Sequence, residues 1–187
     1  MILEKLIKSV IGDQPRPTVR AIRNEDVPAI VRTEIVNFHE PASATAFYGL
    51  IGTAYPRSVW VGTLGVSDEP VGYVVCETND YCVVIRSISV DPYCQGFGVG
   101  RALLDFVCGR YAGGRPVEVY VPEIRVGAQR FFASCGFRCY ATIDRYYSDN
   151  SNAFAFHKAK KPISYFGHCE SLENDRPRPR TAPGNRK

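Results

Sequence analysis

Short apolar runs alternate with amphipathic stretches between Thr18 and Lys160. Runs rich in Val, Ile and aromatic residues, bounded by turn residues, predict strands. Apolar residues at helical spacing predict helices, and Asn24 is expected to cap the first of them. The expected strands cover residues 19–22, 58–64, 71–77, 81–90, 117–121, 137–142 and 153–157, and the expected helices cover 24–38, 42–51, 101–111 and 124–134.

The order of these elements predicts the fold class. Residues 81–90 are apolar on both faces apart from Arg86 and the serines, as expected for a strand in the middle of a sheet. Two helices follow the first strand, three strands then follow one another, and the remaining helices separate the later strands. This order predicts an α/β (α+β) architecture, with helices on the faces of a mixed sheet.

Length and composition predict one domain. The chain has 187 residues, of which 45% are hydrophobic, enough for a single core. We expect that domain to span residues 17–160. Residues 1–16 carry an amphipathic pattern, which favours packing on the domain or on a second copy, as in a homodimer, over membrane attachment. Residues 161–187 are rich in Pro and Arg and are expected to be disordered.

Charge and cysteine content indicate the class of partner and the cell compartment to expect. The formal net charge is +4, but the chain from Lys158 onward carries eight Lys or Arg against three acids, so the preceding part is close to neutral. The basic balance of the tail is therefore weak evidence for nucleic-acid binding. Charged residues or glycine interrupt every apolar window, which predicts no membrane span. Seven cysteines without a CxxC pair or a secretory leader favour reduced thiols, a cytoplasmic location and no metal site.

Three glycines mark the strongest local motif. Gly96, Gly98 and Gly100 lie between the apolar strand that ends at Val90 and the helix expected from Arg101. A glycine-rich bend before a helix directs free N–H groups and the positive helix end at one point, which suits a phosphate. A Walker loop would need Lys-Ser/Thr after the last glycine, and a dinucleotide fingerprint would need G-x-G-x-x-G after the first strand. Neither fits.

A third phosphate-binding pattern does fit. Residues 95–100, QGFGVG, match the Q/R-x-x-G-x-G/A motif, and residues 131–137, FFASCGF, resemble the later F-Y-x-x-x-G-F helix ending. With both motifs in this order, the sequence resembles the GCN5-related N-acetyltransferases (GNAT). The resemblance implies a mixed, mostly antiparallel seven-stranded sheet flanked by about four helices, with a splay between the fourth and fifth strands.

The resemblance also implies acetyl-CoA as co-substrate and direct transfer of the acetyl group to an amine, without a metal. The main-chain amides of the glycine loop would hold the CoA pyrophosphate, and the edge of the preceding strand would pair with the pantetheine arm. A main-chain N–H near Val90 would stabilise the oxyanion. The implied cofactor-binding residues are Ile88, Ser89, Val90, Gln95, Gly96, Phe97, Gly98, Val99, Gly100 and Arg101.

The chain departs from the family at the general acid. Many members have tyrosine where this chain has Phe132, which cannot donate a proton. We expect Tyr120 to take the role, with Tyr147, Tyr146, Cys135 or a water as alternatives. Glu118 shares a strand face with Tyr120 and is a candidate base, acting directly or through water, or else a solvated carboxylate.

The acceptor is less well specified. Residues 144–149, DRYYSD, look like the tyrosine-containing hairpin of protein N-terminal acetyltransferases, including those that act on ribosomal proteins. This favours a protein N-terminus or a lysine over a small-molecule amine. However, Arg125 stands where that subgroup commonly has Asn. The alternative from another class is a non-catalytic acetyl-CoA sensor or a partner-docking module.

Overall fold

The computed structural model describes residues 15–111 and 115–158. The segments expected at 1–16 and 161–187 therefore lie outside the described residues, apart from positions 15 and 16. The described part contains the predicted strands and helices. The strands are β1 (Pro17–Ala21), β2 (Arg57–Leu64), β3 (Gly72–Thr78), β4 (Val83–Val90), β5 (Val117–Pro122), β6 (Arg138–Ile143) and β7 (Ala153–Lys158). The helices are α2 (Val27–Asn37), α3 (Ala44–Tyr48), α4 (Val99–Tyr111) and α5 (Val126–Ser134), with 3-10 turns η1 (Asn24–Asp26) and η2 (Pro92–Cys94).

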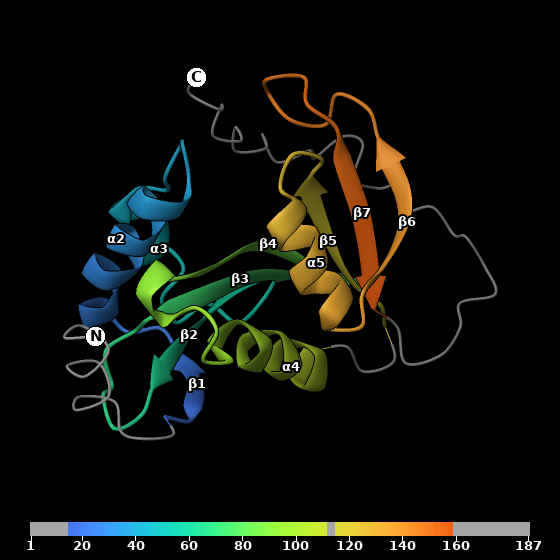
Figure 1. The fold of residues 1–187 in the computed structure, drawn as a ribbon. Coiled ribbons are helices and arrows are strands. Elements are labelled where there is room, and N and C mark those ends of the chain that lie inside the picture. Colours follow the sequence, from blue (N-terminus) through green and yellow to red (C-terminus); the bar gives the residue numbers. More distant parts are fainter. Residues whose placement is uncertain (1–14, 112–114, 159–187) are drawn as a thin grey trace.

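The strands form one mixed sheet in the order β1-β2-β3-β4-β5-β7-β6. Every neighbouring pair is antiparallel except β4 and β5, which run parallel. Parallel neighbours need a crossover connection, and here α4 supplies it. The predicted mixed, mostly antiparallel sheet is thus confirmed (Figure 1).

Two apolar layers hold the helices against the sheet. On one face, Leu103, Leu104 and Val107 of α4 pack with the inward side chains of the central strands, and Phe132 of α5 joins the same cluster. On the other face, α2 and α3 pack on β2 and β3, and Phe47 contacts the ring of the fully buried Tyr73 edge-on. The sheet is therefore covered on both faces, as expected from its apolar central strand.

The pairing of β4 with β5 stops early. Their register runs only from Val83, opposite Val117, to Ile85, opposite Val119. On the other edge of β4, Val75 pairs with Ser87 and Cys76 with Ile85, so Arg86 is an extra residue in a β-bulge. A bulge bends its strand and increases the local twist. From this point β4 stays with β3 while β5 stays with β7, which gives the predicted splay.

The start of α2 differs from the expectation. Asn24 does not cap a continuous helix; it begins the turn η1, and α2 starts three residues later. The side chain of Asp26 accepts a hydrogen bond from the Arg23 main-chain N–H at 2.7 Å, so the aspartate organises this turn. The second helix is also shorter than expected: Ser43 caps its start by accepting from Ala46 N–H, and Gly49 follows its last residue.

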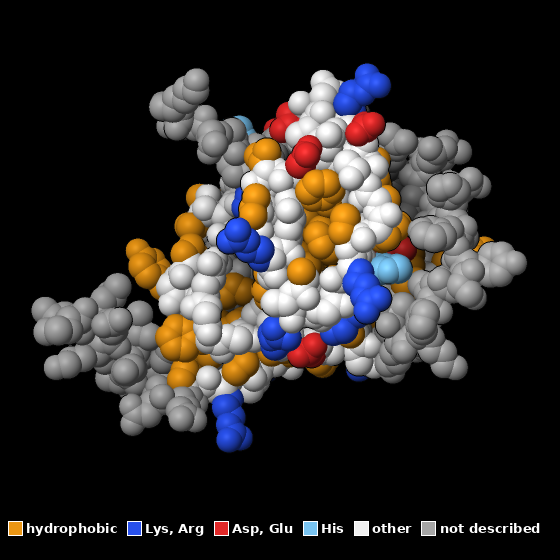
Figure 2. All heavy atoms as spheres, turned by 45° about the vertical axis from the view of Figure 1, so that its right-hand side comes forward, with side chains coloured by type: hydrophobic (Ala, Val, Ile, Leu, Met, Phe, Trp, Pro, Cys, Tyr) orange, Lys and Arg blue, Asp and Glu red, His pale blue; other side chains and the backbone are white. Residues whose placement is uncertain are grey.

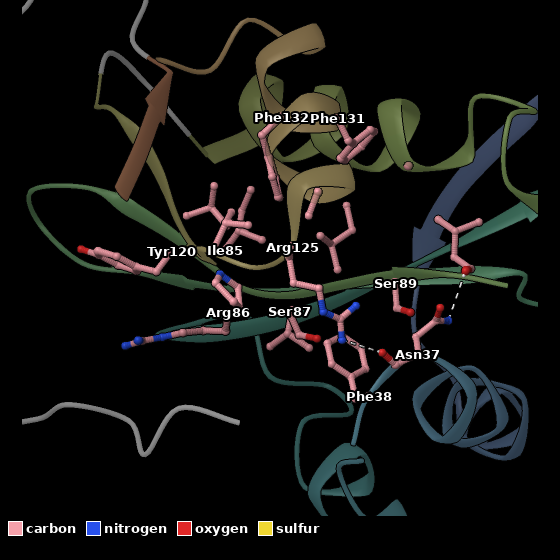
Figure 3. Close-up of a pocket in the computed structure, with 18 of the residues that line it drawn as sticks. Asn37, Phe38, Ile85, Arg86, Ser87, Ser89, Tyr120, Arg125, Phe131 and Phe132 are labelled. Carbon is pink, nitrogen blue, oxygen red and sulfur yellow. Dashed lines mark hydrogen bonds between the residues drawn. The ribbon is translucent and has the colours of Figure 1, made fainter. Parts of the chain in front are cut away.

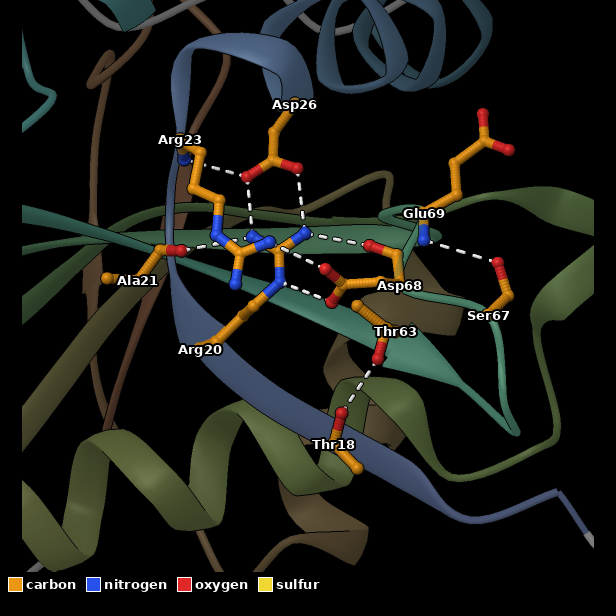
Figure 4. A network of polar contacts seen from close by, with 9 residues as sticks. All are labelled: Thr18, Arg20, Ala21, Arg23, Asp26, Thr63, Ser67, Asp68 and Glu69. Atoms are coloured by element: carbon orange, nitrogen blue, oxygen red, sulfur yellow. Dashed lines mark hydrogen bonds and ion pairs between the residues drawn. The ribbon is translucent and has the colours of Figure 1, made fainter.

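Asp26 also belongs to a network that joins β1 to the connection between β2 and β3 (Figure 4). The Arg20 guanidinium donates two hydrogen bonds to the Asp26 carboxylate, at 2.6 and 2.8 Å, and a third to Asp68 at 2.7 Å. Arg23 donates to the second oxygen of Asp68 at 2.6 Å. Bidentate arginine–carboxylate pairs fix geometry strongly, so this network stabilises the edge of the sheet beside α2.

The side of the molecule that carries β6 and β7 has a mixed surface. Hydrophobic side chains gather in the middle of this face, acidic and basic side chains lie together at its upper end, and Lys and Arg side chains with an acidic side chain among them lie lower down (Figure 2). Charges of both signs are therefore interspersed on it.

Candidate active site

A cavity of about 1040 Å³ lies where β4 and β5 separate. β4, the N-terminal end of α4, β5, α5, the α2–α3 region and the β6–β7 connection all contribute to its wall (Figure 3). Phe97 and Glu118 are the two predicted site residues that do not line it. Those that do are Ile88, Ser89, Val90, Gln95, Gly96, Gly98, Val99, Gly100, Arg101, Tyr120 and Tyr147.

The glycine loop forms one end of the cavity. Gly96 and Gly98 have positive φ angles of 84° and 85°, which a side chain would disfavour. The Gly98 carbonyl accepts from Ala102 N–H at 2.9 Å, so α4 begins directly after Gly98. The first-turn N–H groups of α4 have no acceptor within the helix, and they form the kind of terminus that binds a phosphate group.

Gly100 has a different reason to be glycine. A Cβ at this position would lie 3.0 Å from Cζ of Phe131, so the missing side chain lets α4 approach α5 closely. Arg101 also contacts this helix, because its Nη2 donates to the Ser134 carbonyl at 3.0 Å. The exposed Phe97 lies outside the cavity wall. Two of the three glycines therefore shape the loop, and the third serves helix packing.

The free edge of β4 forms the floor. Asp91 N–H donates to the Val71 carbonyl at 2.8 Å, on the β3 side. In an antiparallel pair the hydrogen-bonding direction alternates along the strand, so the main-chain groups of Val90 and Ile88 point toward the gap left by β5. These groups can pair with an extended ligand, and the Val90 N–H has the position expected of an oxyanion donor.

Two side chains hold the end of this edge. The Val90 carbonyl accepts from Nδ2 of Asn37 at 3.3 Å and from Nε2 of Gln95 at 3.2 Å. Asn37 is the last residue of α2, and Gln95 begins the glycine loop. The end of β4 is thus tied both to α2 and to the loop.

Tyr120 and Glu118 lie on the same face of β5, as predicted from strand alternation. The Tyr120 hydroxyl donates to Oε2 of Glu118 at 3.2 Å, and its ring stacks on Tyr146 with centroids 5.1 Å apart. Burial raises the pKa of both side chains above their ordinary values, although the hydrogen bond from Tyr120 opposes the rise for Glu118. Tyr120 lines the cavity, and the carboxylate of Glu118 lies behind it.

The β6–β7 connection carries two more tyrosines of the wall. The Tyr147 hydroxyl donates to the Tyr120 carbonyl at 3.1 Å, which fastens the connection to β5. Burial raises the pKa of this phenol. Asn152 accepts from Arg145 N–H, a residue with a φ of 50°, and donates to Glu123 at 3.1 Å. The connection is therefore anchored at both ends next to the cavity.

The remaining candidates have packing roles. Phe132 is 3% exposed and packs edge-on against Phe131 and Phe137, so it supplies an apolar wall and no proton. Cys135 is buried behind it. Cys94 lines the cavity, but burial raises the pKa of its thiol and keeps it protonated. Within residues 15–111 and 115–158, no group of three His, Cys, Asp or Glu side chains could hold a metal ion.

Sequence reasoning predicted Arg101, but it gave no site role to the three other arginines of the wall. Arg125 precedes α5 and donates from Nη2 to the Asn37 carbonyl at 2.9 Å, with its guanidinium 5.8 Å from the centre of the Phe38 ring (Figure 3). Arg57 and Arg86 also line the cavity. A lone charge in an apolar central strand was a signal for Arg86, but no local pattern marks Arg57.

Comparisons with known proteins agree with this geometry. Residues 56–139 match the sequence model of the acetyltransferase (GNAT) domain. An uncharacterized N-acetyltransferase of Methanocaldococcus jannaschii is 28% identical over 147 residues, which cover 77% of this chain and 92% of the relative. Ard1 of Thermoplasma volcanium has a similar fold, with a TM-score of 0.67 and 26% identity over 76% of this chain and 97% of that chain. The ribosomal-protein-S18-alanine N-acetyltransferase of Escherichia coli aligns with a TM-score of 0.65 and 20% identity, covering 81% and 100% of the two chains.

Proposed function

Because this chain belongs to the GNAT superfamily of acetyl-CoA-dependent acyltransferases, we propose that it acetylates the α-amino group of protein N-termini. The observation that carries the proposal is the position of Tyr146 and Tyr147. Both line the same cavity as the free edge of β4 and the glycine loop, so an acceptor held by this hairpin would meet the thioester at the splay.

The residues of the cavity suit acetyl-CoA as co-substrate, which would supply the acetyl group as a thioester. The first-turn N–H groups of α4 would bind the pyrophosphate, and the main-chain groups of Ile88 and Val90 would pair with the pantetheine amides. The Val90 N–H would then stabilise the negative charge on the thioester oxygen when the amine attacks.

Tyr120 and Glu118 are proposed to move the amine proton. As the nitrogen attacks the thioester carbonyl, the Tyr120 hydroxyl would take its proton and pass its own to Glu118. Proton transfer toward Glu118 is favoured because burial raises the pKa of this carboxyl and makes it a better base than an exposed carboxylate. When the carbon–sulfur bond breaks, the Tyr120 hydroxyl would act as general acid and give a proton to the departing CoA thiolate, and Glu118 would return the amine proton to Tyr120, which restores both groups. Tyr147, whose hydroxyl contacts the Tyr120 carbonyl, would position the pair.

Two arguments favour an N-terminal amine over other acceptors. An α-amine has an ordinary pKa of about 7.7–8.0 and a lysine about 10.4, so near neutral pH the neutral form is several-hundred-fold more abundant for the α-amine. Polyamines and aminoglycosides would favour an acidic cavity, yet none of the described residues that line it is Asp or Glu. The Escherichia coli structural relative is named for acetylation of an alanine of ribosomal protein S18.

The setting of the reaction is part of the proposal. None of the described helices is long and apolar enough to cross a membrane. The six described cysteines are all free thiols, which supports a reducing, cytoplasmic location. The interspersed charges on the face in Figure 2 give no support for nucleic-acid binding. Homodimer formation stays a prediction, because it rests on the N-terminal segment outside the described residues.

The test is acetyl transfer by the purified protein to matched acceptors. Release of free CoA and a mass gain of one acetyl group would be followed with short peptides, with the same peptides blocked at the N-terminus but carrying lysine, and with small amines. We expect turnover on free N-termini. Turnover only on lysine or small amines would refute the proposed acceptor, and acetyl-CoA binding without turnover on any amine would favour the sensor alternative.

A further inference from the structure

The wall of the cavity has an uneven charge. Four arginines line it, at positions 57, 86, 101 and 125, whereas no Asp or Glu among the described residues does so. Arg101 lies beside the glycine loop at the end assigned to the CoA pyrophosphate. The other three lie away from that loop, so the part of the cavity left for the acceptor is basic.

Arg125 is the least neutralised of these three. It is half-buried, and desolvation lowers the pKa of its guanidinium. Its single hydrogen bond goes to a main-chain carbonyl, that of Asn37, and it forms no ion pair with any of the described carboxylates. A guanidinium has five N–H donors in a planar fork, so most of its donors are left for a ligand. Half-buried charges are normally paired, and a carboxylate is the partner that fits this fork best.

Arg86 and Arg57 form a second basic position. Both donate to the same oxygen of Glu77, at 3.0 and 2.9 Å. Two guanidinium groups share one carboxylate, which leaves an excess positive charge at the cavity wall. The Arg86 side chain is only 15% exposed, so this charge is weakly screened by solvent. In Figure 3 Arg86 and Arg125 extend in different directions from the splay, so the two basic positions are separate.

We infer that Arg125, assisted by the Arg57–Arg86 pair, selects acceptor peptides that carry a carboxylate side chain within their first three residues. This inference rests on the proposed function, since it names the class of N-terminus that the enzyme acetylates. The carboxylate would accept hydrogen bonds from the guanidinium fork while the amine points at the thioester. The same basic wall would repel an N-terminus followed by Lys or Arg.

The experiment uses peptide pairs that differ only by Glu or Gln at position 1, 2 or 3, and a third peptide with Lys at each position. Initial rates with saturating acetyl-CoA give kcat/KM for every peptide. The Glu:Gln ratio is the measured quantity, because general effects on folding or on acetyl-CoA binding cancel in it. For the wild type we expect a ratio of about ten or more at one position at least, since a charge-assisted hydrogen bond is lost with Gln.

Three variants test which arginine causes the preference for Glu over Gln. In Arg125→Gln the ratio should fall toward one, and in Arg86→Gln it should fall in part. Arg32→Gln is the matched control, because Arg32 pairs with Glu69 on the surface outside the cavity and its variant should keep the wild-type ratio. The KM for acetyl-CoA is measured in parallel for each protein.

The outcomes separate the two proposals. Transfer to all peptides with wild-type ratios near one would overturn the acidic preference and leave N-terminal acetylation intact. A high ratio that survives both cavity variants, or an Arg125→Gln effect confined to the KM of acetyl-CoA, would overturn the role given to the arginines. No transfer to any peptide would overturn the proposed function itself, and the inference with it.

Discussion

The Tyr120 hydroxyl donates to the Glu118 carboxylate at 3.2 Å across one face of β5, so the two groups form a hydrogen-bonded pair. The pair has an inner and an outer member, because the cavity wall includes Tyr120 and does not include Glu118. A proton leaving an amine in the cavity would therefore reach Glu118 through the phenol. This arrangement gives each residue a different expected effect when it is changed.

Replacing Tyr120 by Phe should slow the chemical step. The ring would keep its stacking contact with Tyr146, but the proton path would be cut. General acid–base groups contribute about 10²–10⁴-fold, so we expect kcat to fall about 100-fold with the KM of acetyl-CoA within about twofold of the wild type. Steady-state kinetics on the best peptide measures both values.

Tyr140→Phe is the matched control for this variant, because Tyr140 also hydrogen-bonds Glu118 but does not line the cavity. Its kcat should change little. An undiminished kcat in Tyr120→Phe would move the proton-transfer role to Tyr146, Tyr147 or a water.

Replacing Glu118 by Gln should raise the stability of the protein and lower its activity. Burial raises the pKa of this carboxyl in the folded protein, so the native state holds the proton more tightly than the unfolded state. The resulting stabilisation is present at low pH and is lost as the pH rises from the ordinary value, about 4.3, through the folded pKa. At pH 7.5 the ionised group therefore costs stability, and we expect the variant to melt at a higher temperature than the wild type.

The difference in melting temperature should shrink as the pH falls below about 4, where Glu118 becomes protonated in both states. The variant should also lose at least tenfold in kcat, because the glutamine cannot accept the proton. Melting curves and rates measured across this pH range test both statements. If the two melting temperatures changed with pH in the same way, folding would not raise the pKa of Glu118.

Local patterns predicted the parts of the fold that depend on neighbouring residues. The apolar run that contains β4 identified the central strand, and the glycines at 96 and 98 identified the loop before α4, because these features lie within one segment. Glu118 and Tyr120 were placed on a common face by the two-residue period of a strand. The helix of residues 24–38 was misjudged at its start, since Asp26 is engaged by Arg20 from another element.

The acceptor half of the site depends on tertiary contacts. The hydrogen bond from Arg125 to Asn37 joins residues 88 positions apart, and the Arg57 and Arg86 side chains meet at Glu77 only after β2, β3 and β4 pair. The spacing of residues within a single helix or strand does not predict such contacts. Gly100 shows a different limit of sequence analysis. Its position in the motif suggested a ligand contact, but the ring of Phe131 also leaves too little room for a side chain there.

The network around Asp26 makes a prediction about stability alone. The Asp26 side chain is 2% exposed and pairs with Arg20 at 2.6 Å. Removing one partner of a buried pair leaves an uncompensated charge, which typically costs about 3–5 kcal/mol. Because Arg20 keeps its contact with Asp68, we expect Asp26→Ala to lower the free energy of unfolding by about 3 kcal/mol, measured by urea denaturation.

The control for this measurement is Glu69→Ala. Glu69 pairs with Arg32, and both side chains are 64% exposed, so the loss should stay within about 0.5 kcal/mol. A similar loss in the two variants would mean that the network does not stabilise the fold beyond an ordinary surface pair.

The last prediction concerns the glycine loop and isolates charge from backbone strain. Gly98 has a φ of 85°, which costs any side chain some strain, and a Cβ there would meet no atom closer than 3.9 Å. Asn and Asp tolerate this conformation best and have the same shape, so Gly98→Asn and Gly98→Asp should fold with similar stability. If the α4 terminus binds the CoA pyrophosphate, the aspartate places a negative charge against it. We expect the Kd of acetyl-CoA, measured by calorimetry, to rise at least tenfold more in Gly98→Asp than in Gly98→Asn, and equal affinities would refute the assignment of this loop.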